Sequence, residues 1–330
     1  MNGSESLIKT LVNNGVEVCF TNPGTSEMHF VAALDRVDGM RCVLGLFEGV
    51  VTGAADGYAR MLDRPAATLL HLGPGLANGL SNLHNALRAH SPMVNIIGDH
   101  ATFHRQLDAP LTSDIEGAAR PFSHWVRTSA SANALASDAA AAVAAARSAP
   151  GKISSLILPA DAAWNEVSVR QPEIAADPLV LPPARPADAA IDAAAEILKL
   201  DETTALILAG QATRQAPLEM AGMISAATGA RLYSQTLTPR ITRGAGRVAI
   251  DRIPYPIDQA IDLLKDVDNI ILVGATEPVG FFAYPGKPGK LFRPGTRIHQ
   301  LVAIDGDIAY ALEALVDAIG ANKLSPDKVD

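Results

Sequence analysis

Cysteine, aromatic residues and clusters of basic residues are all scarce in this chain. Of its 330 residues only 2 are cysteines, and aromatic residues make up 5%. Two cysteines cannot form the disulfide framework of a small secreted domain. Because Cys19 and Cys42 each lie in an apolar, strand-like run, we interpret both as buried thiols of a reducing compartment.

Excess positive charge and long apolar segments are also lacking. The formal net charge is −8, and no group of lysines and arginines offers a surface for nucleic-acid phosphates. No apolar run approaches the roughly 18 residues that a membrane-spanning helix needs. Residues 1–6 lack the basic and apolar regions of a signal peptide. We therefore expect a cytoplasmic protein that binds neither nucleic acid nor membrane.

Strand-like apolar runs and helical patterns alternate along the first half of the chain. The apolar runs end near residues 20, 45, 72, 98 and 158, and turn formers and helical patterns separate them. Repeated β-loop-α units with apolar strands predict a mainly parallel sheet with helices on both faces. The predicted fold class is α/β, with two doubly wound domains.

A proline-rich stretch divides the chain in two. Five prolines fall between residues 166 and 186, and they predict an extended linker. We expect a first domain over residues 1–165 and a second α/β domain over residues 187–320. The polar residues 321–330 resemble the start of another linker.

Three loops of the first domain hold the candidate functional residues. Right-handed crossovers place all strand-to-helix loops at the carboxyl edge of a parallel sheet, where open α/β sheets bind ligands. Residues 22–25, 46–48 and 71–78 all lie in such loops. We expect them to converge on one site.

Glu48 stands out because apolar residues flank it just beyond a strand-like run. A buried carboxyl group without a partner is destabilising, so it either forms a pair or serves a ligand. The nearest basic residues in the sequence, Arg41 and Arg60, allow a salt bridge. The alternative is a functional acid in an apolar pocket at the tip of a strand.

Other patterns favour ordinary structural explanations. The run Gly73–Gly79 follows a strand, but Asn78 stands where a dinucleotide fingerprint needs glycine. His100 and His104 have the spacing of metal ligands on a helix, yet turn formers surround them, and a polar active-site loop or exposed histidines explain them better. His71, at the end of a strand, is either a satisfied core histidine or a functional one.

Three motifs occur in the order and at the spacing of one enzyme family. Phe20–Glu27 (FTNPGTSE), Phe47–Arg60 (FEG at its start, AADGYAR at its end) and Gly73–Gly79 (GPGLANG) resemble the N-terminal pyrimidine-binding domain of thiamine-diphosphate-dependent enzymes. The resemblance is to the acetolactate synthase, pyruvate oxidase and benzoylformate decarboxylase group. Residues 185–320 are similar to the central domain of these enzymes, notably at Leu272–Ala275 and Arg293–Arg297.

The resemblance implies a role for each matching residue. The family glutamate that matches Glu48 bonds N1′ of the aminopyrimidine and favours the tautomer that removes the thiazolium C2 proton. The cofactor then serves as electron sink for decarboxylation of a 2-oxo acid. The histidine that matches His71 faces the substrate in benzoylformate decarboxylase, and His100 and His104 are further substrate-side candidates. The other expected cofactor-binding residues are Asn22, Pro23, Gly24, Thr25, Pro74, Gly75 and Asn78.

The chain departs from the family pattern in two places. A second substrate-side histidine, expected near Phe281–Tyr284, is absent, so the 2-oxo acid and the outcome, decarboxylation or carboligation, stay open. The family's motif for binding the diphosphate and Mg²⁺ is also absent, and no residue here is expected to bind metal.

We therefore expect the aminopyrimidine-activating half of a site, inactive alone. A diphosphate-binding domain from a continued or separate chain would complete it in a homodimer or tetramer. The alternatives are a non-catalytic fragment, an assembly module, or a module that binds FAD near Gly210–Arg214.

Overall fold

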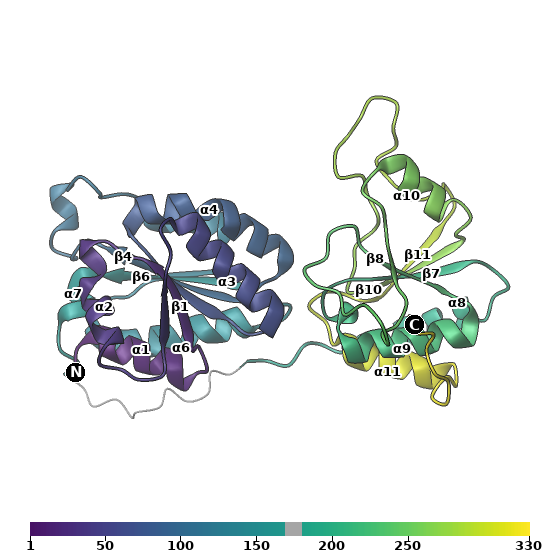
Figure 1. Cartoon of the computed structure of the whole chain (residues 1–330), viewed down its shortest axis with the longest axis horizontal. Helices are drawn as coiled ribbons and strands as arrows, with labels where there is room; N and C mark the ends of the chain where they lie inside the picture. Colours follow the sequence, from purple (N-terminus) through teal and green to yellow (C-terminus); the bar gives the residue numbers. More distant parts are fainter. Residues whose placement is uncertain (169–179) are drawn as a thin grey trace. The chain divides into compact units, whose positions relative to one another are not determined.

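The computed structural model describes residues 1–168 and 180–330. The chain divides into two compact units, Met1–Leu181 and Pro182–Asp330 (Figure 1). Within the predicted linker 166–186, residues 169–179 lie outside the described residues. Each unit is built around a parallel sheet flanked by helices, so the predicted α/β fold class is confirmed.

The first sheet has the strand order β2-β1-β3-β4-β6-β5. The strands β3, β4 and β6 are buried along their whole length, which explains their continuous apolar sequences. The edge strand β5 is only half-buried, and it was not predicted. The bounds are β1 (Val18–Asn22), β2 (Arg41–Leu44), β3 (Ala66–Leu70), β4 (Met93–Asp99), β5 (Trp125–Thr128) and β6 (Ile153–Pro159).

Helices cover both faces of this sheet (Figure 1). Leu69 belongs to the core on one face and Leu70 to the core on the other, because successive side chains of a strand alternate. The first core packs against α1 (Gly3–Asn13), α2 (Met28–Leu34), α6 (Leu135–Arg147) and α7 (Ala160–Trp164). The second packs against α3 (Glu48–Leu62), α4 (Leu72–Ala89) and α5 (Ile115–Ala119).

Helix α4 begins at Leu72, so it includes most of the stretch 71–78 that was expected to be a loop. Gly73 and Pro74 occupy its first turn. Proline is tolerated there because the first N–H groups of a helix have no acceptor within the helix. His71 is consequently the single residue between β3 and α4, and Leu72 has a strained, positive φ of 47°.

The two cysteines differ in exposure. Cys19 in β1 is buried, whereas Cys42 in β2 is exposed. The predicted burial of Cys42 was wrong because β2 is an edge strand, paired only with β1.

The second sheet has the order β11-β10-β7-β8-β9. Its strands are β7 (Thr204–Leu208), β8 (Arg231–Ser234), β9 (Asp251–Arg252), β10 (Asn269–Val273) and β11 (Arg297–Val302). The helices α8 (Asp188–Leu198), α9 (Gln215–Thr228) and α11 (Ile308–Ala318) share one core, and α10 (Ile257–Leu264) belongs to the other. The exposed strand β9 and helix α10 were not predicted. Within the described ranges, no helix is long and apolar enough to cross a membrane.

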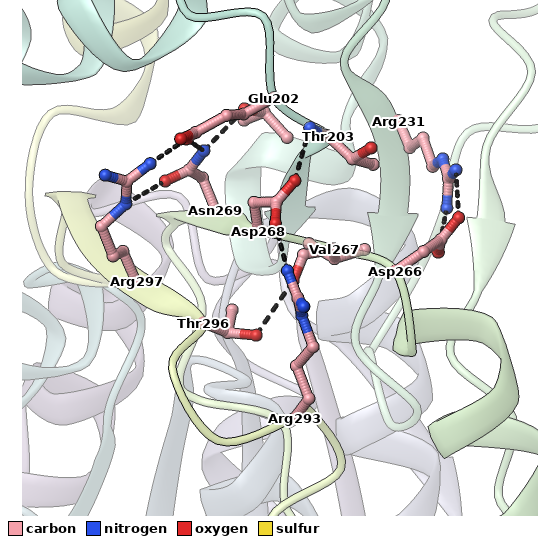
Figure 2. A network of polar contacts seen from close by, with 11 residues as sticks. Glu202, Thr203, Arg231, Asp266, Val267, Asp268, Asn269, Arg293, Thr296 and Arg297 are labelled. Carbon is pink, nitrogen blue, oxygen red and sulfur yellow. Dashed lines mark hydrogen bonds and ion pairs between the residues drawn. The ribbon is translucent and has the colours of Figure 1, made fainter.

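A polar network joins the amino ends of β7, β10 and β11 (Figure 2). The Nδ2 of buried Asn269 donates to Oε2 of Glu202 at 2.9 Å, and its Oδ1 accepts from Nε of Arg297 at 2.8 Å. Asp268 pairs with Arg293. Arg293, just before β11, and Arg297, its first residue, thus tie this end of β11 to the starts of β10 and β7.

We expect Asn269→Ala to lower the free energy of unfolding by about 1–3 kcal/mol, because it removes hydrogen bonds to two charged partners. Urea denaturation followed by circular dichroism measures this loss. Lys265→Ala, which breaks the exposed ion pair with Asp262, is the control and should leave the free energy unchanged within error. Equal losses in the two variants would contradict a structural role for Asn269.

Candidate functional site

The candidate site lies at the carboxyl ends of β1 and β3. The chain runs from β1 to β2 on one side and continues with β3 on the other, so the strand order reverses between β1 and β3. Open α/β sheets bind ligands at such a reversal. Asn22 ends β1 and residues 23–25 follow it, Glu48 opens α3 after β2, and His71 follows β3.

Asn22 joins the first two of these loops. Its Nδ2 donates to the backbone oxygen of Gly45 at 2.7 Å, and the Gly45 N–H donates to the Thr21 oxygen at 2.8 Å. Both bonds hold the segment before Glu48 against the end of β1. The Asn22 side chain therefore helps to set the start of α3.

Glu48 is buried, with 8% of its surface exposed, at the first position of α3. The Nδ2 of Asn78 on α4 donates to its Oε2 at 3.0 Å. Neither Arg41 nor Arg60 forms an ion pair with it in the described part of the chain, and Arg60 pairs with another carboxylate. Its Oε1 faces Gly75, where a Cβ would lie 3.2 Å away. One oxygen is thus held by an amide, and the other has no hydrogen-bond partner among the described residues.

Glu27 is a second buried carboxyl group, and it was not predicted as a site residue. It is 1% exposed, and it ends the short 3-10 helix η1 (Thr25–Glu27). Its Oε2 accepts from the Gly24 N–H at 2.8 Å and lies 2.8 Å from Nδ1 of His71. Burial raises the pKa of the Glu27 carboxyl, although hydrogen bonds from His71 and Gly24 oppose that rise. The spacing from Gly24 signals a helix start, but nothing local in the sequence pointed to His71.

His100 and His104 form a separate pair after β4, with ring centroids 5.6 Å apart. No hydrogen bond, ion pair or ring contact between described residues joins either of them to Glu48 or His71, and they stay predicted substrate-side candidates. Over residues 1–168 and 180–330, no three His, Cys, Asp or Glu side chains gather as metal ligands. The remaining predicted residues flank the site: Pro23, Gly24 and Thr25 in the loop after β1, and Pro74 and Gly75 in the first turn of α4.

An apolar surface lies beside Glu48. It consists of Leu44, Leu46, Phe47 and Val50, all exposed, with Leu46 at 91%. Phe47 and Val50 also line a hollow of about 440 Å³ between α3 and α4. Contiguous exposed apolar residues of this kind mark interaction surfaces.

Comparison with known proteins identifies the family. Residues 1–118 match the model described as thiamine pyrophosphate enzyme, N-terminal TPP binding domain. The chain is 49% identical over 328 residues to IlvX of Mycobacterium tuberculosis, provisionally named an acetolactate synthase large subunit, with 99% of this chain covered. It is 29% identical over 327 residues to benzoylformate decarboxylase of Pseudomonas aeruginosa, with 94% of this chain covered. The chain belongs to the thiamine-diphosphate-dependent enzymes.

A solved relative shares the fold. The thiamine diphosphate-dependent 4-hydroxybenzoylformate decarboxylase of Rhodococcus jostii RHA1 superposes with a TM-score of 0.80 at 21% identity, over 100% of this chain and 63% of that one. The chain spans 62% and 60% of the lengths of the two curated relatives.

The buried Glu27 predicts a pH dependence of stability. Its pKa in the folded protein lies above the ordinary value of 4.5, so between these two values the folded state holds a proton that the unfolded state has released. Stability therefore falls as the pH rises through this interval. Because Glu27→Gln cannot titrate, we expect the parent to lose stability relative to this variant as the pH rises above 4.5.

Urea titrations at stepped pH measure this difference. Glu17→Gln removes an exposed glutamate and serves as control, because its difference from the parent should not follow the same course. A Glu27→Gln difference that stays constant from pH 4.5 to neutrality would contradict the raised pKa.

Proposed function

We propose that this chain supplies the aminopyrimidine-binding half of the thiamine diphosphate site in a 2-oxo acid decarboxylase or carboligase. The observation that carries the proposal is the environment of Glu48, a buried carboxyl group at a strand tip with one oxygen left open. The matched family model supports the cofactor. The names of the two curated relatives, one an acetolactate synthase subunit and one a decarboxylase, support the class of reaction.

The residues around Glu48 fit an aminopyrimidine ring. Gly75 leaves space beside Oε1 that a Cβ would fill, and Asn78 fixes the other oxygen. Glu48 would hold a proton at Oε1 opposite a ring nitrogen, and its burial would keep competing water away. When bound, thiamine diphosphate supplies the nucleophilic carbon and the electron sink for decarboxylation. His71, next to this cluster, would handle a proton on the substrate side.

The diphosphate group and its Mg²⁺ would be held by a further domain, from a continued or a separate chain. The curated relatives are longer than this chain. The apolar surface of Leu44, Leu46, Phe47 and Val50 supports such a contact, because it lies beside Glu48 and exposes large side chains. We propose that the complete protein is a homodimer or tetramer.

The alternative is a non-catalytic module that binds a nucleotide such as FAD in the second unit. The short 3-10 helix η5 (Gly210–Thr213) follows β7, and the strand order reverses between β7 and β10, where such a ligand would dock. A flavin spectrum in the purified protein would favour this alternative.

Glu48→Gln tests the proposed role directly. In protein that combines this chain with a diphosphate-binding domain, we expect exchange of the C2 proton of thiamine diphosphate to slow by about 100-fold or more, because glutamine has no proton to transfer. NMR of acid-quenched samples measures the exchange. Glu17→Gln, exposed just before β1, is the matched control. Full exchange in the Glu48→Gln variant would reject the proposal.

Calorimetry tests whether the cofactor site is divided between this chain and a further domain. We expect the 330-residue chain alone to show no tight, Mg²⁺-dependent binding of thiamine diphosphate, because charge-assisted contacts to the diphosphate would come from the further domain. Adding that domain should restore binding. Tight Mg²⁺-dependent binding by the chain alone would show that it holds the whole site.

A further inference from the structure

We propose that Glu27 is a positioning residue for His71, and that this carboxylate–histidine pair presents Nε2 of His71 as a proton-accepting atom of the site. The inference deepens the proposed function and rests on it for the reaction that the pair serves. The geometry of the pair is a property of the chain itself.

The pair bridges two strand ends. Glu27 follows β1 and His71 follows β3, and Oε2 of the acid lies 2.8 Å from Nδ1 of the ring. Glu27 is 1% exposed, whereas 24% of the His71 side chain is exposed. The acid is therefore enclosed, and the ring reaches from it toward solvent at the carboxyl edge of the sheet.

The hydrogen bonds of Glu27 assign the tautomer of His71. Its Oε2 already accepts from the Gly24 N–H at 2.8 Å, so this oxygen acts as an acceptor. An acceptor opposite Nδ1 places the ring hydrogen on Nδ1 and leaves the lone pair on Nε2. Nε2 has no partner in the described part of the chain, and it is not one of the buried polar atoms that lack one. It is open to solvent or to a ligand.

The surrounding backbone makes room for this pair. A Cβ at Gly98 in β4 would overlap Oε1 of Glu27, and a Cβ at Gly24 would overlap the His71 ring. Leu72, next to His71, has the positive φ of 47°. Strained backbone of this kind persists where the surrounding structure holds it, and it is frequent at functional sites.

A purely structural role would explain the contacts of one carboxyl oxygen of Glu27 but not the environment of the other. The helix start needs the bond from the Gly24 N–H to Oε2, which a glutamine at position 27 could also supply. Oε1, in contrast, is buried without a hydrogen-bond partner among the described residues, which is destabilising. A carboxylate is retained at that cost because a charge next to His71 orients the ring and stabilises the imidazolium that forms when Nε2 accepts a proton.

NMR of the histidine side chains in the full chain tests the pair without cofactor or activity. In protein labelled with ¹⁵N-histidine, two-bond ¹H–¹⁵N correlations report which ring nitrogen carries the hydrogen, and His71→Ala assigns the signal. We expect the hydrogen on Nδ1 in the parent. Glu27→Ala should shift it mainly to Nε2, Glu27→Gln should keep a large share on Nδ1 through its amide oxygen, and Glu17→Ala should change nothing. A hydrogen on Nε2 in the parent would overturn the proposal, even if Glu27→Ala does not fold.

Kinetics of the complete protein separate this inference from the proposed function. We expect Glu27→Ala and His71→Ala each to lower kcat for a 2-oxo acid by about tenfold or more with little change in KM, and Glu27→Gln to recover part of the loss. C2-proton exchange, which depends on Glu48, should persist in all three. An unchanged kcat in Glu27→Ala would overturn the positioning role. If the parent protein itself showed no C2-proton exchange, the proposed function would be rejected. The NMR result on the histidine tautomer would still hold.

Discussion

The side chains of Glu27 and Glu48 are buried where the strands of the first sheet end. Each must find hydrogen-bond partners away from water, and this need constrains the loops around them. Glu27 is bonded to Gly24 and His71, and Glu48 is bonded to Asn78. The loop after β1 is thereby tied to the end of β3, and the start of α3 is tied to α4. Neither acid forms an ion pair with a lysine or arginine among the described residues, so their hydrogen bonds come from Gly24, His71 and Asn78.

The predictable part of the fold was the buried part. The strands β3, β4 and β6 have helices on both faces, and their apolar runs are plain in the sequence. The edge strands β5 and β9 have no such run, because β5 is only partly buried and β9 is exposed. The exposure of Cys42 depends on the order of the strands, which local pattern does not contain. The start of α4 at Leu72 could not be predicted from the sequence because Gly73 and Pro74 also favour a turn.

The residues of the site also fall into those that could be predicted from the sequence and those that could not. Glu48 could be singled out because its apolar neighbours make a charge unusual there, and its burial agrees with that argument. Its partner Asn78 was expected near the site, but not the bond between them. Glu27 was missed because Thr25 and Ser26 make it look like an ordinary helix start. Its partner His71 lies 44 residues further along the chain, and only the pairing of β1 with β3 brings the two together.

The close approach of Glu27 to Gly98 links two positions that are far apart in sequence. A Cβ at residue 98 would overlap Oε1 of Glu27, so the carboxyl would have to move if any other residue stood there. Alanine or serine at 98 would therefore disturb the contact between Glu27 and His71 from a strand that lies further along the chain.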